Sequence, residues 1–432
     1  MPRKTLNAFL MRELAASPGV QRLVVGFSGG LDSTVLLQAL AREASAFALP
    51  VLAVHVHHGL SPNADAWARH AQSQCDALGI PLQICRVQIA PQGSVEAAAR
   101  AARRAAFAGV LKAGDALLLA QHQDDQAETL LFRLLRGAGV RGLAAMAEVS
   151  RFPLDEKSYV PQWRPLLGVS RAQLEQWAQA EDLHWIEDES NADSRYARNF
   201  LRNEALPLLR TRWPGAAETL AATAARLREA DGLLTELARE LASQAVDAQQ
   251  RLHIPQVLAL SPAKQRLLLR YWLQEQDFLA PDEAMLDRIR EEVIPAREDA
   301  APLLQWESAE IRRYREQLYA MRPLSVLPEN WEQAWSGEQD LLLPDGRLLR
   351  LDSAPENLRV TYRRGGERLQ VGGLSRELKT LFQENAVPPW ERERLPLVWR
   401  GSELLVVAGM DWRLREDAPV LHLLSLERER EQ

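Results

Sequence analysis

The sequence has very little cysteine, with only Cys75 and Cys85 among its 432 residues. Two cysteines are too few for a disulfide framework, and their spacing does not match that of a metal site. A reducing compartment fits this composition best. No stretch approaches the roughly 18 consecutive apolar residues of a membrane span, and the first residues lack the apolar run of a signal peptide. We therefore expect a cytoplasmic protein that does not enter the membrane.

Lysine is also scarce, so arginine carries nearly all of the positive charge. The net charge is −6, which gives no general attraction to nucleic acid. Only five of the 52 basic residues are lysines. Genomic composition bias is the simplest explanation for so much arginine, so arginine clusters are judged by their position and not by their number.

The first 135 residues contain alternating strand-like and helix-like segments. Apolar runs at 22–27, 51–56, 81–89 and 116–122 are typical of buried strands, and the segments between them have helical spacing. This alternation predicts an α/β fold with a doubly wound parallel sheet. Ligands of such sheets bind at the carboxyl ends of the strands, so we expect the functional residues there.

The rest of the chain predicts two further domains after an N-terminal catalytic domain at 1–215. An alanine- and leucine-rich segment after Pro214 reads as a long connecting helix, and helical spacing continues through a middle domain at 216–325. Short apolar runs and turns then predict a small α+β domain at 326–432. Within it, the segment DLLLPDGRLLRLD has a DG turn between two strand-like runs.

The hexapeptide SGGLDS, formed by Ser28, Gly29, Gly30, Leu31, Asp32 and Ser33, lies between the first predicted strand and a helix. Glycines let the backbone approach phosphate oxygens, and the free N–H groups of a helix N-terminus bind anions. The two serines add hydroxyl donors, and Asp32 can hold Mg²⁺ against phosphates. An ordinary glycine-rich turn is the alternative, but the full string in this context favours an ATP site.

Two other nucleotide-binding motifs are disfavoured. SGGLDS lacks the GK[ST] ending of the nucleoside triphosphatase P-loop. Gly137, Gly139 and Gly142 spell G-x-G-x-x-G, but they follow a predicted helix, whereas a dinucleotide fingerprint follows a strand. We interpret these glycines as a helix end and loop.

A second candidate site lies in AQHQDDQAETLLFRLLRGAG at 120–139. We expect His122 to end the fourth strand and the acids after it to open a helix. Asp125 and Glu128 are three positions apart, so both fall on one helix face. Acids there can bind Mg²⁺ or an ammonium group, while plain capping of the helix N-terminus is the alternative.

A third candidate is the arginine series Arg195, Arg198 and Arg202, which follows the turn-like segment EDESNADS. Their spacing of three and four predicts one helical stripe of guanidinium groups, suited to phosphate or RNA backbone. A solvated helix face is the alternative.

Three histidines in VHVHHG also suggest a site. His55 and His57 fall on one face of the second predicted strand, which is compatible with zinc. Neither a carboxylate nor a further histidine follows closely in sequence, so we interpret this segment as a strand end, with His55 on the wall of the adenine pocket.

SGGLDS resembles the pyrophosphatase loop of the N-type ATP pyrophosphatases, which have an adenine nucleotide α-hydrolase-like (PP-loop) fold. Together with VHVHHGLSPNADAWA, VEAAARAARRAAF, AQHQDDQAETLLFRLLRGAG, RPLL, EDESN…RNFLR and GGERLQVGG…LLVVAGM, it closely resembles the tRNA(Ile)-lysidine synthetase family. The match extends through most of the chain.

The resemblance implies an ATP- and Mg²⁺-dependent ligase acting on an isoleucine tRNA with a CAU anticodon and on free L-lysine. The wobble cytidine would be adenylated at its C2 oxygen, and lysine would then displace AMP. Ser28–Ser33, His55 and His122 would bind ATP, and Asp32 would bind Mg²⁺. Glu128 would hold the lysine ammonium group, with Arg198 or Arg202 near the reacting nucleotide.

The proton acceptor and the rest of the substrate-binding set are the remaining assignments. Asp125 could accept the proton of the attacking amine. Arg195 joins the expected substrate-binding set together with Asp125, Glu128, Arg198 and Arg202. The oligomeric state is left open, a homodimer included.

Three rival functions are disfavoured. A tRNA thiolation enzyme with the same loop would need cysteines for sulfur transfer or an iron–sulfur cluster, and this chain has no C-x-x-C pair. A binding module that senses nucleotide without chemistry would not need the intact set of Ser28, Asp32, Ser33, Asp125 and Glu128. A small-molecule amide synthetase would keep the loop but would not explain two further domains.

Overall fold

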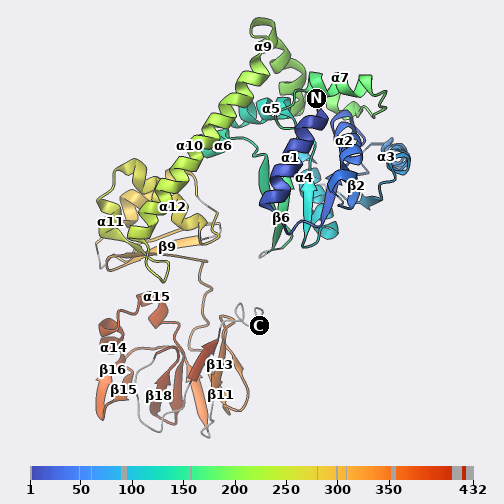
Figure 1. Cartoon of the computed structure of the whole chain (residues 1–432). Coiled ribbons are helices and arrows are strands. Elements are labelled where there is room, and N and C mark those ends of the chain that lie inside the picture. The colour runs from blue at the N-terminus through green and yellow to red at the C-terminus, as the bar shows by residue number, and fades with distance from the viewer. Residues whose placement is uncertain are drawn as a thin grey trace. The chain divides into compact units, whose positions relative to one another are not determined.

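The computed structural model divides the chain into two compact units, Met1–Glu236 and Leu237–Gln432 (Figure 1). It describes residues 2–47, 49–59, 61–88, 95–155, 158–279, 281–297, 300–307, 309–351, 357–410 and 421–424. The boundary between the units falls inside one helix, α10 (Ala216–Ala245). The three-domain division at 215 and 325 stays a prediction.

The first unit is built on a six-stranded sheet with the order β3-β2-β1-β4-β6-β5. Only β5 is antiparallel to its neighbour, so the parallel sheet expected from the sequence is confirmed. The hairpin of β5 and β6, which extends one side of the sheet, was not anticipated. The strands are β1 (Arg22–Gly26), β2 (Val51–His57), β3 (Leu82–Arg86), β4 (Asp115–Leu118), β5 (Val149–Pro153) and β6 (Tyr159–Trp163).

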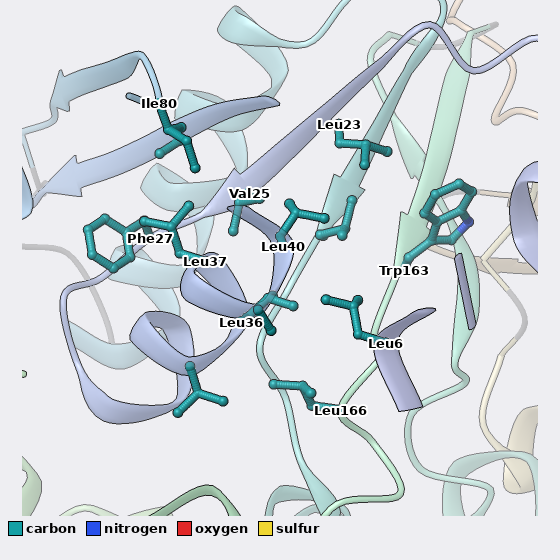
Figure 2. Close-up of a cluster of buried hydrophobic side chains, with 14 of the residues drawn as sticks. Leu6, Leu23, Val25, Phe27, Leu36, Leu37, Leu40, Ile80, Trp163 and Leu166 are labelled. Atoms are coloured by element: carbon teal, nitrogen blue, oxygen red, sulfur yellow. The ribbon is translucent and has the colours of Figure 1, made fainter. Parts of the chain in front are cut away.

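Helices cover both faces of this sheet because the central strand β1 is apolar on both sides. Leu23 and Val25 pack into a buried cluster with Leu36 and Trp163, whereas Val24 between them belongs to a second cluster with Phe107. Figure 2 shows the first cluster. The helices of this part of the chain are α1 (Pro2–Ala16), α2 (Leu31–Phe47), α3 (Ala64–Leu78), α4 (Val95–Val110), α5 (Gln123–Leu134), α6 (Val140–Leu143) and α7 (Arg171–Ala180).

The strand order places two loops side by side. The strand β1 pairs with β2 on one side and with β4 on the other, with Val25 of β1 opposite Leu118 of β4. The loop into α2 and the loop into α5 therefore meet at the carboxyl edge of the sheet, the usual ligand position of a doubly wound fold. The strand β4 ends at Leu118, so His122 does not end a strand as expected but is the N-cap residue of α5.

After the sheet, the first unit continues through short helical turns: η1 (Glu189–Ala192), α8 (Ala197–Phe200), η2 (Leu201–Ala205) and α9 (Leu206–Arg212). The segment η2 is a π-helix. In the part of the chain that the structure describes, no helix is both long and apolar enough to cross a membrane.

The beginning of the second unit combines helices with a sheet. Its core surrounds Trp272 and Leu268, both almost fully buried. The helices agree with the sequence, but the antiparallel sheet β7-β10-β9-β8 was not anticipated. The elements are β7 (Leu252–His253), α11 (Ile254–Leu258), α12 (Pro262–Gln274), α13 (Glu283–Arg288), η3 (Ile289–Val293), β8 (Leu303–Trp306), β9 (Ala309–Tyr314) and β10 (Gln317–Met321).

The remainder of the second unit is rich in strands, as expected for an α+β domain. The predicted DG turn joins β12 to β13, which pair in antiparallel fashion with Leu342 opposite Leu348. The elements are β11 (Glu332–Trp335), β12 (Leu341–Leu342), β13 (Leu348–Leu351), β14 (Leu358–Thr361), β15 (Arg368–Val371), β16 (Leu374–Glu377), α14 (Leu378–Glu384), α15 (Pro389–Arg392), β17 (Leu397–Arg400), β18 (Glu403–Val407) and β19 (Leu421–Leu424).

Candidate active site

The SGGLDS segment forms a closed turn at the N-terminus of α2. The Ser33 hydroxyl donates to the Gly30 carbonyl at 3.0 Å and accepts from the Ser28 backbone N–H at 3.2 Å. The Ser28 and Ser33 hydroxyls lie 3.0 Å apart. Because α2 begins at Leu31, its first N–H groups have no intrahelical partner and face this turn. The turn has the chemistry of an anion cradle.

A segment without regular secondary structure, from far along the chain, closes over the same turn. Ile186 donates its backbone N–H to the Gly29 carbonyl at 2.9 Å. Gly29 has a left-handed φ of +83°, and a Cβ atom built on it would lie 2.9 Å from the Ile186 Cδ1 atom. Glycine is therefore required at position 29 by both its backbone conformation and the close approach of Ile186. Ile186 was not predicted from the sequence.

Asp32 and His122 face each other across the two adjacent loops. The Nε2 atom of His122 lies 3.6 Å from Asp32 Oδ2 and 3.5 Å from Asp125 Oδ2. His122 is 1% exposed. Burial alone would lower the pKa of His122, but the three surrounding carboxylates, Asp32, Asp125 and Asp124, outweigh burial and raise it.

The carboxylate of Asp32 fits a cation. Its Oδ1 atom is buried and has no hydrogen-bond partner. Burial alone would raise the pKa of Asp32, but His122, Arg171 and Arg202 together lower it, so the group is ionised at neutral pH. Within the described residues, no group of three or more His, Cys, Asp or Glu side chains could hold a metal ion by itself. Mg²⁺ commonly takes one or two carboxylates together with substrate phosphates, and Asp32 beside the cradle suits that arrangement.

Asp125 and Glu128 do share one face of α5, as predicted, and Arg202 bridges them. The guanidinium donates to Glu128 Oε1 at 2.6 Å and Oε2 at 2.9 Å, and to Asp125 Oδ1 at 3.0 Å. Asp125 also accepts the His122 backbone N–H at 3.0 Å, which caps the helix. Asp125 therefore caps the N-terminus of α5 and also lies in the candidate site. Burial raises the pKa of Glu128, and the pairing with Arg202 opposes it.

The predicted arginine stripe is wrong in one of its three members. Arg198 in α8 donates to Thr129 at 2.8 Å, and Arg202 in η2 reaches the α5 acids. Arg195 precedes α8 and forms a bidentate pair with Asp193, and its side chain is 88% exposed. The cause is local, because Asp193 lies two positions away and captures Arg195 before the helix begins. A role of Arg195 in substrate binding stays a prediction.

Two further arginines that sequence reasoning missed approach the same carboxylates. Arg171 at the start of α7 donates its backbone N–H to Asp124 at 2.9 Å, and its guanidinium lies 3.6 Å from Asp32. Arg210 in α9 pairs with the other oxygen of Asp124. Asp124 is buried at the N-terminus of α5, so it ties α7 and α9 to the site. Nothing in the local sequence of either arginine signals this contact.

The three histidines of VHVHHG have separate surroundings. His55 is buried, with Nδ1 3.0 Å from the Phe27 carbonyl oxygen, and His57 lies 3.1 Å from Asp65. Burial, helped by nearby positive charges, lowers the pKa of His58 to about 4. These contacts give the histidines structural partners, and the place of His55 on an adenine pocket stays a prediction.

The two cysteines lack the character of sulfur-transfer groups. Cys75 is buried in α3, and burial raises the pKa of its thiol to about 11. Burial also raises the pKa of the Cys85 thiol. A thiolate is the reactive form of cysteine, so both thiols are poorly suited to nucleophilic chemistry.

A parallel doubly wound sheet with an anion cradle after β1 and an acidic cluster after β4 defines a nucleotide-binding protein of the PP-loop class. The family model described as "PP-loop domain" matches residues 4–209. The models "TilS substrate binding domain" and "TilS substrate C-terminal domain" match residues 252–319 and 358–419. These three matches lie in succession along the chain.

Full-length relatives identify the family. A tRNA(Ile)-lysidine synthase of Pseudomonas aeruginosa is 46% identical over 450 residues, which cover 97% of this chain and 98% of the relative. One of Xanthomonas campestris pv. campestris is 43% identical over 420 residues, covering 93% and 95%. The chain belongs to the tRNA(Ile)-lysidine synthase family. Among solved structures, a U34-tRNA thiolase from Methanococcus maripaludis has a TM-score of 0.43 at 17% identity, covering 53% of this chain and 78% of that chain.

Proposed function

We propose that this protein joins free L-lysine to C2 of the wobble cytidine, position 34, of tRNA(Ile) with a CAU anticodon, and consumes ATP to AMP and pyrophosphate. The cytidine O2 would attack the α-phosphate, which releases pyrophosphate and leaves an adenylated base. The lysine amine would then attack C2 and expel AMP. The product reads AUA in place of AUG and is charged with isoleucine in place of methionine.

The observation that carries this proposal is the junction of the phosphate cradle and the acid pair through one buried histidine. Asp32 lies in the first turn of the cradle helix α2, Asp125 lies in the first turn of α5, and His122 lies within 3.6 Å of both carboxylates. A nucleotide held at the first and an ammonium group held at the second would therefore be neighbours. Family membership supplies the identity of the two substrates.

The first step needs an anion site and a cation. The backbone N–H groups and hydroxyls of Ser28–Ser33 would bind the β- and γ-phosphates, and Asp32 would hold Mg²⁺. Bound there, Mg²⁺ would offset the negative charge of the departing pyrophosphate. A protonated His122 would add positive charge to the same side of the cradle.

The second step needs carboxylates that can hold lysine and take a proton. Asp125 has 16% of its side chain exposed, whereas Glu128 has 1% exposed and both its oxygens bound to Arg202. Asp125 is thus the more exposed of the two acids, and we assign the entering ammonium group to it in place of Glu128. Glu128 fixes Arg202 and adds negative charge behind it. Asp125 is also placed to accept the proton of the attacking amine.

The reacting nucleotide needs a cation that is not already neutralised. Arg198 donates to the hydroxyl of Thr129, and among the described residues no carboxylate pairs with it. Arg202 by contrast is bound to two acids. We therefore assign the tRNA phosphate or adenylate contact to Arg198 and a positioning role to Arg202.

Incorporation of radiolabelled lysine tests the proposal. The protein is incubated with ATP, Mg²⁺, labelled lysine and isoleucine tRNA transcripts that carry either CAU or another anticodon. Lysine incorporated only into the CAU transcript, with one AMP and one pyrophosphate per lysine, is the expected result. No incorporation by a folded protein that still binds ATP would favour the nucleotide-sensing binding module.

A further inference from the structure

A cavity lies within the second unit. Its volume is about 500 Å³, and its wall includes Arg313, Tyr314, Arg315, Gln383 and Arg392. The first three belong to the end of β9 and the turn into β10, and the other two belong to α14 and α15. Three arginines on one cavity wall are a concentration of positive charge in a chain whose net charge is −6.

Each of these guanidinium groups is held by neutral oxygens. Arg315 donates to the Gln383 carbonyl at 2.7 Å, and Arg392 donates to the Val387 carbonyl at 2.7 Å and to the Tyr314 hydroxyl at 2.9 Å. Arg313 donates to the Arg315 carbonyl at 3.1 Å and to the carbonyl of Ile294. These bonds fix the orientation of the guanidinium groups but neutralise none of their charge.

Two acids that neighbour cavity residues in the sequence are paired with other residues. Glu384, next to Gln383, pairs with Arg376 at 2.6 Å, and Glu316, next to Arg315, lies 3.7 Å from His253. Across the described residues, no carboxylate forms an ion pair with any of the three cavity arginines. Most other arginines of this unit do have such a partner, so the cavity stands out, within the described residues, as a group of arginines without ion-pair partners.

An aromatic ring stiffens the arrangement. The guanidinium carbons of Arg315 and Arg392 lie 5.4 Å and 5.7 Å from the centre of the Tyr314 ring. That ring in turn packs edge-on against Trp390, with ring centres 6.3 Å apart. Cation–π contacts and a fixed ring hold two cations close together without an acid between them. Rigid, planar donors of this kind suit the oxygens of a phosphate group.

We propose that this cavity binds a phosphodiester group of the tRNA backbone. The inference rests on the proposed function, because it takes tRNA as the substrate. Arg315 and Gln383 are exposed, so a phosphate on a long polymer can reach the site without being enclosed. Phosphate contacts of this kind position RNA without reading its sequence. A free phosphate or nucleotide would offer the same oxygens and is separated from RNA by the experiment below.

The test uses the full chain with Arg315→Gln, and with Arg315→Gln and Arg392→Gln together. Arg288→Gln is the matched control, because Arg288 is half exposed in the same unit but already paired with Glu292 at 2.9 Å. The dissociation constant for the CAU transcript is measured by filter binding over a series of KCl concentrations. Lysine incorporation gives kcat and KM, and calorimetry follows binding of inorganic phosphate.

Loss of one phosphate contact is expected to weaken tRNA binding roughly threefold to tenfold and to make the log–log salt dependence shallower by about one. KM for tRNA rises, kcat stays unchanged, and the control behaves as wild type. Because Arg392 also holds the Val387 loop, the single Arg315 variant decides the outcome if the double variant folds poorly.

Three results would overturn the proposal. If tRNA affinity and its salt dependence are unchanged in both variants, the cavity does not bind tRNA, and the proposed function stays intact. If the variants bind tRNA as tightly as wild type but show no heat of phosphate binding, the cavity binds a free anion and not tRNA. A wild-type chain that neither binds nor modifies tRNA overturns the proposed function as well.

Discussion

The Nε atom of Arg202 lies 2.6 Å from Oε1 of Glu128, and its Nη2 atom lies 2.9 Å from Oε2, across 74 positions of sequence. This two-point contact joins the π-helical segment η2 to α5. It also gives a nearly inaccessible carboxylate a cation as its neighbour, which a charge at 1% exposure requires.

Arg202→Ala is expected to destabilise the site, because it leaves the charge of Glu128 buried without a cationic partner. The expected loss is about 2 to 4 kcal/mol in the local free energy of opening. Hydrogen exchange of peptides covering 123–134 measures it. Arg195→Ala, which removes an exposed arginine, is expected to leave this local free energy of opening unchanged.

The double variant Arg202→Met, Glu128→Gln gives the complementary result. With no charge left in the buried position, much of the protection is expected to return. A double variant as unprotected as Arg202→Ala would contradict the idea that the stranded charge is the cause.

Asp32→Asn is expected to abolish adenylation, because it removes the charge that would hold Mg²⁺ while it keeps the size of the side chain. ATP–pyrophosphate exchange in the presence of tRNA should fall by at least about 100-fold. Glu292→Gln, an exposed acid in the second unit, serves as the control. Full exchange activity in a folded Asp32→Asn protein would show that adenylation does not need the carboxylate of Asp32.

Gly29→Ala is expected to disable the cradle by steric conflict. Left-handed backbone costs any alanine about 1 kcal/mol, and at this position the new Cβ would also meet the Ile186 Cδ1 atom at 2.9 Å. Gly79→Ala is the matched control, since Gly79 has a φ of +65° and open space around it. Both variants should lose similar backbone energy, but only Gly29→Ala should lose pyrophosphate exchange.

Ile186→Val separates the two causes, because valine lacks the Cδ1 atom. Combined with Gly29→Ala, it is expected to restore part of the exchange activity. If the combination is no better than Gly29→Ala alone, backbone strain and not the Ile186 contact explains the loss.

The pKa values of His122 and His58 are expected to be shifted in opposite directions. The pKa of His122 lies above the ordinary 6.5 because three carboxylates surround it, and the pKa of His58 lies at about 4 because of burial. At pH 6, His122 should therefore be charged and His58 neutral. Ring-proton NMR, with the resonances assigned from His58→Asn and His122→Asn, measures both values.

The same shift predicts how stability depends on pH. A raised folded-state pKa means that charged His122 stabilises the fold fully below pH 6.5, and that this contribution is lost as the pH rises through the folded-state pKa. The difference in stability between wild type and His122→Asn should thus shrink across that range. A difference that grows with pH would contradict the assignment.

Much of the nucleotide site could be predicted from the sequence because it depends on local order. A buried strand followed by SGGLDS, and a later strand followed by HQDDQAE, are each readable within about ten residues. The parallel sheet then brings the two loops together, and both Asp125 and Glu128 share a helix face as their spacing requires.

The parts that could not be predicted depend on contacts between distant segments. Arg210 binds Asp124 across 86 positions, and Ile186 closes on Gly29 across 157 positions. Neither residue is marked by a motif. The arginine stripe failed for the opposite reason, since spacing of three and four assumes a helix that Asp193 and the polar turn before it prevent from starting at Arg195.

The π-helical geometry of η2 makes the length of this segment matter more than its composition. Leu201–Ala205 lies between the contact of Arg198 with Thr129 and the contact of Arg210 with Asp124. Removing one residue there would return the turn to ordinary α-helical bonding and rotate one side relative to the other by about 100°. Both arginines could not then reach α5 at once. Natural variants should therefore keep Leu201 and Arg202, tolerate substitutions at the other positions of this turn, and tolerate no insertion or deletion.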